Sequence, residues 1–149
     1  MKKYKKISII VLCVYLLLGT GCINEDVEGN KIGDEIIRCL NEDDTEGLKD
    51  VFCAETQTST DLDNQIEAGM DFFDGKVDSH FDAGVDGGES VTNGETVEQH
   101  YTIDYYELKT DTGKLYEVIC EGYFISEENP DKVGVSIINI VDEDGNVCK

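Results

Sequence analysis

The sequence predicts an α+β domain in which N-terminal helices pack on a curved, mainly antiparallel sheet. Two observations predict this fold class. Apolar residues recur at helical spacing between residues 32 and 73, and they alternate with polar residues from residue 76 to residue 141. The alternating segments are joined by short turns, which favours an antiparallel meander. Helices followed by an antiparallel sheet are typical of the α+β layout.

Residues 1–21 are expected to form a secretory signal. Four lysines among the first six residues precede an apolar run over residues 7–18, which only Ser8 interrupts, and small residues follow it. Such a run is too short to cross a bilayer as a stable helix. A basic start, a short apolar stretch and small residues together are typical of a secretory signal, so the protein is expected to leave the cytoplasm.

Cys22, directly after Thr20 and Gly21, resembles the cysteine of a bacterial lipobox, whose thiol is alkylated by diacylglycerol and which becomes the new N-terminus. Two acyl chains give a stable anchor, which predicts a protein held on the extracytoplasmic face of the cell membrane. The alternatives are ordinary cleavage near Gly21, which leaves a free thiol, and an uncleaved anchor. Residues 22–30 are then the lipidated cysteine and a short tether, and residues 31–149 form a single domain.

The chain is strongly acidic, with 33 Asp and Glu against 12 Lys and Arg and a formal net charge of −21. Removal of the signal would remove four lysines and no acid. This charge excludes a nucleic-acid partner, because phosphates require a basic surface. It also argues against electrostatic binding to anionic lipids, which leaves the N-terminal lipid as the expected membrane contact. Solubility explains the acids better than specific cation binding.

Three helices are expected in the first half of the domain. Their apolar stripes are Ile32, Ile36, Ile37 and Leu40; Leu48, Val51 and Phe52; and Leu62, Ile66, Met70 and Phe73. Residues 41–44 are suited to cap the second helix, residues 59–61 precede the third, and Gly75 ends it. Stripes of this kind form core far more often than a cofactor site.

Three strands are expected over residues 97–108, 115–125 and 133–141, joined by turns at residues 111–113 and 128–131. The middle strand is apolar on both faces, which predicts a central position in the sheet. Weaker strand signals lie at residues 76–82 and around Val91, and the glycine-rich residues 84–88 are expected to separate them.

Three segments carry a resemblance to a known family: IIRCLNEDDTEGLKDVFC, LDNQIEAGMDFFDGKV and ENPDKVGVSIINIV. They resemble a family of small Gram-positive lipoproteins described only as a domain of unknown function, over residues 33–141. That family is similar to the nuclear-transport-factor-2-like, or cystatin-like, cone folds, in which a long curved sheet wraps helices around a pocket. The resemblance implies this fold but no catalytic motif, because cone folds host isomerases, dehydratases, binding modules and scaffolds alike.

The sharpest cluster of chemical groups is Asp78, His80 and Asp82, which a strand would place on one face. A histidine between two carboxylates can bind a divalent metal or act as a base. We favour a solvated outer face, because no second histidine or cysteine lies at ligand spacing. The same interpretation applies to His100 with Asp104.

Neither residues 82–89 nor residues 142–145 match the calcium-binding loop of an EF-hand, which needs oxygen ligands at alternate positions and a distal glutamate. The second of these stretches fits an Asp-Gly turn better. No metal or cofactor is therefore expected.

Outside the cell, four cysteines are available for disulfides: Cys39, Cys53, Cys120 and Cys148. Three connectivities are possible, and the spacing does not separate them. The chain has no CxxC motif, which argues against a zinc ribbon or a thioredoxin-type site. Cys39 and Cys120 fit small buried apolar positions, whereas Cys148 is expected to be more exposed.

A pocket between the helical stripes and the inward strand face would be lined by Met70, Phe73, Tyr101, Tyr105 and Tyr116. The same residues describe an ordinary filled core, which we favour, because no histidine or carboxylate can be placed beside these rings. The leading hypothesis is a lipid-anchored extracytoplasmic binding or interaction domain whose partner is a small molecule or an envelope protein. The alternatives are an isomerase-like or dehydratase-like enzyme with a cone pocket, and a protective, immunity-type surface protein.

Overall fold

The computed structural model describes residues 25–80 and 83–148. The expected signal, Cys22, Phe81, Asp82 and Lys149 lie outside these residues. The helices are α2 (Glu25–Glu42), α3 (Thr45–Val51), α4 (Ala54–Gln57) and α5 (Leu62–Phe72). The strands are β1 (Val77–Ser79), β2 (Gly84–Thr92), β3 (Glu95–Thr110), β4 (Leu115–Ser126), β5 (Gly134–Asp142) and β6 (Val147–Cys148), with a 3-10 turn at Pro130–Lys132 before β5. The predicted α+β class is confirmed.

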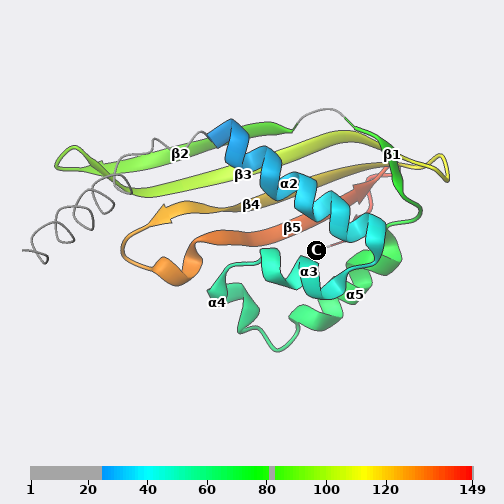
Figure 1. The fold of residues 1–149 in the computed structure, drawn as a ribbon, viewed down its shortest axis with the longest axis horizontal. Coiled ribbons are helices and arrows are strands. Elements are labelled where there is room, and N and C mark those ends of the chain that lie inside the picture. The colour runs from blue at the N-terminus through cyan, green and yellow to red at the C-terminus, as the bar shows by residue number, and fades with distance from the viewer. Residues whose placement is uncertain (1–24, 81–82, 149) are drawn as a thin grey trace, which may run out of the picture.

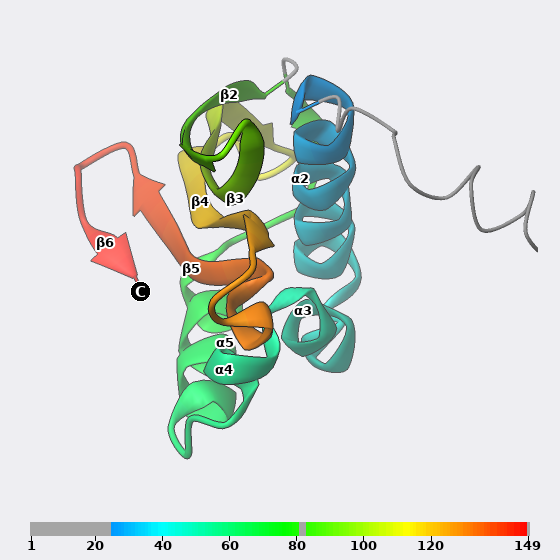
Figure 2. The same ribbon diagram turned by 90° about the vertical axis from the view of Figure 1, so that its left-hand side faces the viewer.

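The sheet is open, has six strands and is mainly antiparallel. Its order is β1-β3-β4-β5-β6, and β2 pairs with β3 beside β1. β4 lies between β3 and β5, which confirms the central position expected for it. Figure 1 shows the long strands β2 to β5 side by side, with α2 crossing them and α3, α4 and α5 gathered next to β5. In the view turned by 90°, α2 lies along one side of the sheet and β6 turns away on the other side (Figure 2).

The core lies between the helices and the inner face of the sheet. On β3 the alternation places Tyr101, Ile103 and Tyr105 inward, all at most 2% exposed. The register then shifts between Tyr105 and Leu108, where Glu107 adopts a positive φ of 52°. This bulge returns Leu108 to the inner face, where it is completely buried. Burial of each such side chain contributes about 1.5–3 kcal/mol of hydrophobic stabilisation.

Residues 25–30, which were expected to belong to a tether, form the first turns of α2, which begins at Glu25. The sequence there is polar, and Gly29 suggests an end of helical structure. In the fold Gly29 is buried, and a Cβ built on it would lie 2.6 Å from a methyl group of Val85 in β2. A small residue is therefore required where the first turns of α2 cross β2.

The glycine-rich residues 84–88 do not separate two strands, because they form the first half of β2. Gly87 pairs with Tyr101 and Gly88 pairs with His100 of β3. A Cβ on Gly87 would overlap the carbonyl oxygen of His100. Glycine here permits a close approach of two strands, whereas a run of glycines in a sequence is more typical of a loop.

Candidate functional site

The aromatic residues expected around a pocket fill the core instead of lining a space. Phe73, Tyr101, Tyr105 and Tyr116 are 1–7% exposed, and the partly buried Met70 packs against this core. The rings of Phe73 and Tyr116 lie 4.6 Å apart. None of the five residues lines the two cavities described below.

Two of these tyrosines hold helices to the sheet through their hydroxyl groups. Tyr105 Oη donates to the carboxylate of Asp34 at 3.1 Å in α2. Tyr116 Oη donates to the carbonyl oxygen of Phe72 at 3.2 Å and accepts from the backbone N–H of Asp74 at 3.0 Å. These hydroxyl groups are engaged in structural hydrogen bonds, so they are not positioned to orient a ligand.

The histidines lie at the surface. His80, just after β1, is exposed, and its ring meets the ring of Tyr105 edge to face at 5.5 Å. Asp78 is exposed in β1, and Asp82 is outside the described residues. His100 is exposed on β3. Within residues 25–80 and 83–148, no group of three or more His, Cys, Asp or Glu side chains is arranged to hold a metal ion.

All four cysteines of the domain are free thiols in this structure. Cys39, Cys53 and Cys120 are buried, which agrees with the buried positions expected for Cys39 and Cys120. Burial raises the pKa of Cys39 to about 11 and that of Cys120 to about 12. Both therefore stay protonated near neutral pH and are unsuited to act as nucleophiles. Cys148, in β6, is only partly buried.

A cavity of about 260 Å³ lies between helices α3, α4 and α5 on one side and strands β5 and β6 on the other. We call it the β5 groove. Its helical wall comprises Leu48, Phe52, Thr56, Leu62, Gln65, Ile66 and Gly69, and its strand wall comprises Ser136, Ile137, Ile138, Ile140 and Cys148. The volume is below the 300–1,000 Å³ typical of sites for drug-sized ligands.

Gly69 forms part of the α5 wall of the β5 groove. Leu62, Ile66 and Gly69 lie on one face of α5 at helical spacing, and all three are buried. A Cβ built on Gly69 would reach the Cδ1 atom of Ile140 at 3.7 Å, an ordinary van der Waals contact. A larger side chain at this position would therefore extend into the groove.

A small polar cluster fixes one end of the β5 groove. Thr56 Oγ1 donates to the carbonyl oxygen of Ser136 at 3.3 Å and lies 3.3 Å from Cys53 Sγ. The backbone N–H of Cys53 donates to the carbonyl oxygen of Val135 at 2.7 Å. These bonds hold α4 against the start of β5, so this end of the groove is preformed.

The lining of the β5 groove is mainly apolar. Among the residues that the structure describes, its lining has no histidine, lysine, arginine or carboxylate, and Cys148 is its one titratable side chain. Histidine and the carboxylates are the side chains that most often act as general acids and bases. The apolar walls suit contact with an apolar group. The few polar groups in the lining are hydroxyl, amide and thiol groups. Sequence reasoning missed this site, although a glycine on an apolar stripe was a signal for it.

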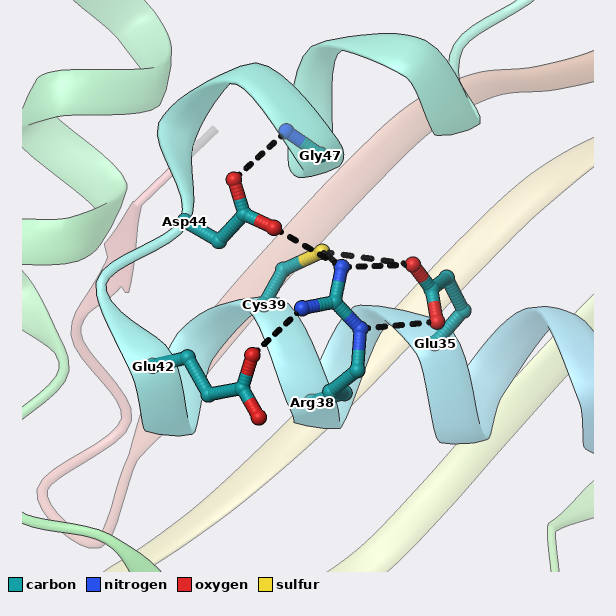
Figure 3. A network of polar contacts seen from close by, with 6 residues as sticks. All are labelled: Glu35, Arg38, Cys39, Glu42, Asp44 and Gly47. Atoms are coloured by element: carbon teal, nitrogen blue, oxygen red, sulfur yellow. Dashed lines mark hydrogen bonds and ion pairs between the residues drawn. The ribbon is translucent and has the colours of Figure 1, made fainter.

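A second feature is the network around Arg38 at the turn from α2 to α3 (Figure 3). Arg38 donates to Glu35 at 2.6 and 2.9 Å, to Glu42 at 2.6 Å and to Asp44 at 2.8 Å. Asp44 also accepts from the backbone N–H of Gly47 at 2.9 Å and so caps α3. The expected capping by residues 41–44 is confirmed.

The Arg38 network is structural. A shallow depression of about 480 Å³ lies beside it, lined by Asp34, Ile37, Arg38, Asn41, Glu42 and His80. The guanidinium group is already surrounded by three carboxylates, so it does not offer a free cation to an anionic ligand. Its effect is to join α2 to the start of α3, and Leu48 of α3 then lines the β5 groove.

Acid should weaken the fold through this network. Hydrogen bonds from Arg38 lower the pKa of Glu35 below 4.5, and the Gly47 N–H and Arg38 lower the pKa of Asp44 below 3.8. A carboxylate with a lowered pKa in the folded state stabilises that state above its unfolded pKa, and the stabilisation is lost as the pH falls through the folded value. We expect the melting temperature, followed by circular dichroism, to fall below about pH 4.5.

The Arg38→Met variant should show a smaller acid-induced fall in melting temperature than the wild type. The matched control is Lys31→Met, which removes an exposed ion pair with Glu28 elsewhere on α2. The control should keep the wild-type slope. Equal slopes for wild type and Arg38→Met would contradict this role of Arg38.

The fold and the groove define a class of protein, a small α+β domain with an apolar groove beside an edge strand. Among the described residues, no helix combines the length and the apolar character needed to cross a membrane. A family model described as Domain of unknown function (DUF5104) matches residues 35–143. The chain belongs to this family, which agrees with the resemblance to a family of unknown function. A comparison with curated proteins finds no match.

Proposed function

We propose that the protein is a lipid-anchored binding domain, which holds an apolar group of its ligand in the β5 groove on the extracytoplasmic face of the cell membrane. The observation that carries the binding function is the apolar groove, whose lining among the described residues has no histidine, lysine, arginine or carboxylate. The partly preformed wall supports it, since Thr56, Ser136 and Cys53 fix one end without a ligand.

The anchor in this proposal is Cys22, supported by the basic and apolar residues before it. The first described helix, α2, begins at Glu25, three positions after Cys22. Three residues span at most about 10 Å. An acylated Cys22 would therefore hold the domain directly at the membrane surface, and ligands bound there would belong to the cell envelope or its immediate surroundings.

We further propose that the fold is a nuclear-transport-factor-2-like, or cystatin-like, cone. The long strands β3 and β4, their register shifts and the helices on the inner face support this assignment. The space inside such a cone is occupied here by Tyr101, Tyr105 and Tyr116. The site for a ligand then lies at the β5 edge, and an isomerase-like or dehydratase-like enzyme has weaker support.

The Gly69→Leu variant tests whether the β5 groove binds apolar groups. Benzene is a suitable probe, because apolar protein cavities can take it up. In the wild type, titration should shift the methyl NMR signals of Leu48, Ile66 and Ile140 in a saturable manner. Gly69→Leu should weaken benzene binding by about tenfold or more, because the new side chain fills the groove.

The matched control is Ala68→Leu, which adds leucine at an exposed position next to Gly69 on the same helix. It should bind benzene as the wild type does. Gly69→Ala should give an intermediate affinity, and circular dichroism should confirm that each variant is folded. Equal affinities for wild type and Gly69→Leu would refute binding in the groove.

A further inference from the structure

The β5 groove lies along the hydrogen-bonding edge of β5. It is not confined to one face of the strand. Ser136, Ile137 and Ile138 are consecutive, and all three line the cavity. Successive side chains of a strand point to opposite faces of the sheet. A cavity lined by three consecutive residues therefore lies against the edge of the strand, where backbone groups are available.

This edge of β5 lacks a strand partner over its middle part. β6 pairs only with Ile140 and Val141, and the bridge from Phe52 reaches only Val135. Between these contacts, residues 136–139 have no strand beside them on this edge in the part of the chain that the structure describes. Ile137, in this gap, leaves 45% of its surface exposed.

The backbone of Ile138 points into this gap. The N–H of Asp142 donates to the carbonyl oxygen of Asn146, on the side of β5 away from β4. The pairing of β5 with β4 is regular from Ile137 to Asp142, so backbone groups alternate between the two edges. Ile138, four residues before Asp142, then presents its N–H and carbonyl group to the open edge.

The described segments that line the β5 groove carry more acids than bases. Residues 50–75, which include α4 and α5, contain no Lys or Arg, and their acids include Glu55, Asp63, Glu67 and Asp71. Residues 133–148, which include β5 and β6, contain no Lys or Arg either, and Lys132, just before them, lies over the ring of Tyr123. The nearest base along α3, Lys49, is paired with Asp63 at 2.6 Å. This charge complements a basic partner.

We propose that the occupant of the β5 groove is an extended peptide segment of a partner protein, which adds to β5 as a further strand. One apolar side chain of the segment enters the groove, and Lys or Arg residues on either side are attracted to the acidic segments that line it. In strand addition, backbone hydrogen bonds supply affinity and pockets for side chains supply specificity. This assignment rests on the proposed function and specifies the class of its ligand.

The test uses a short, fluorescently labelled peptide of alternating lysine and valine with a central leucine, and the mature domain. Binding is measured by fluorescence anisotropy. Two altered peptides separate the contribution of charge from that of backbone hydrogen bonds. One replaces lysine by glutamate, and the other carries N-methyl groups on the backbone nitrogens that would face β5. Each alteration should weaken binding by about tenfold or more. The amide of Ile138 should exchange its hydrogen more slowly in the complex.

The protein variants locate the site. Gly69→Leu should weaken binding of the parent peptide about tenfold, whereas Ala68→Leu should not. Equal binding of the parent and N-methylated peptides, or no binding of the parent at millimolar protein concentration, would overturn strand addition. Equal binding of the glutamate peptide would overturn the basic partner. In each of these cases, binding of benzene in the groove would still support the proposed function. If benzene does not bind to the wild-type protein, the proposed function itself is refuted.

Discussion

Replacement of Gly33 by valine is expected to destabilise the protein by about 3 kcal/mol or more, the upper end of overpacking effects. Gly33 lies in α2 directly against the ring of Tyr105, and a Cβ at this position would overlap the ring carbons. The ring is 1% exposed, and its hydroxyl group donates to Asp34. Because this ring is buried and hydrogen-bonded, a valine at position 33 must displace either the ring or α2 from its place on β3.

Urea denaturation followed by circular dichroism measures this effect. The control is Gly69→Ala, also a helical glycine, whose new methyl group makes only an ordinary contact with Ile140. It should be stabilising by about 0.5–1 kcal/mol, because alanine favours helix. A double variant of Gly33→Val and Tyr105→Ala should be less destabilised than the sum of the single variants. If Gly33→Val unfolds at the same urea concentration as the wild type, α2 does not pack on β3 in this way.

The Cys22→Ala variant should lose its membrane attachment completely, because only a cysteine thiol can form the thioether to diacylglycerol. Cys22 lies outside the described residues, so this expectation rests on the pattern of residues 1–22 in the amino-acid sequence. The measurement is fractionation of bacterial cells that produce the protein, with mass spectrometry of its N-terminal peptide. In the wild type, that peptide should begin at Cys22 and carry acyl groups.

The matched control for this variant is Cys148→Ala, which removes a partly buried thiol of the folded domain. It should remain in the membrane fraction. Retention of Cys22→Ala in the membrane, or a wild-type peptide that begins at Met1 without lipid, would contradict the anchor.

Much of the fold was predictable because its longest elements are amphipathic. Strand β3 buries one face against the helices, so its apolar residues alternate along the sequence, whereas β4 is apolar on both faces because it lies inside the sheet. α4 and β6 were missed, because four and two residues are too few to show a period. The first half of β2 was missed because its glycines serve close contact with β3, which the sequence of β2 alone does not reveal.

The site was less predictable than the fold. Tyr101, Tyr105 and Tyr116 were identified as inward residues, and the structure places them inward, but whether inward rings surround a space depends on tertiary packing. The β5 groove arises where α5 faces β5 and β6, segments far apart in the sequence. Its one local signal is Gly69 on the stripe of Leu62 and Ile66. The open edge of β5 likewise follows from how short β6 is.

The central claim is that ligands occupy the β5 groove and not the interior under the sheet. Intermolecular nuclear Overhauser effects between benzene and the methyl groups of the wild-type protein test it most directly. Effects to Leu48, Ile66 and Ile140, which line the groove, are predicted. Effects confined to Ile103 and Val118, which lie in the filled core, or an absence of effects at every methyl group, would contradict the claim.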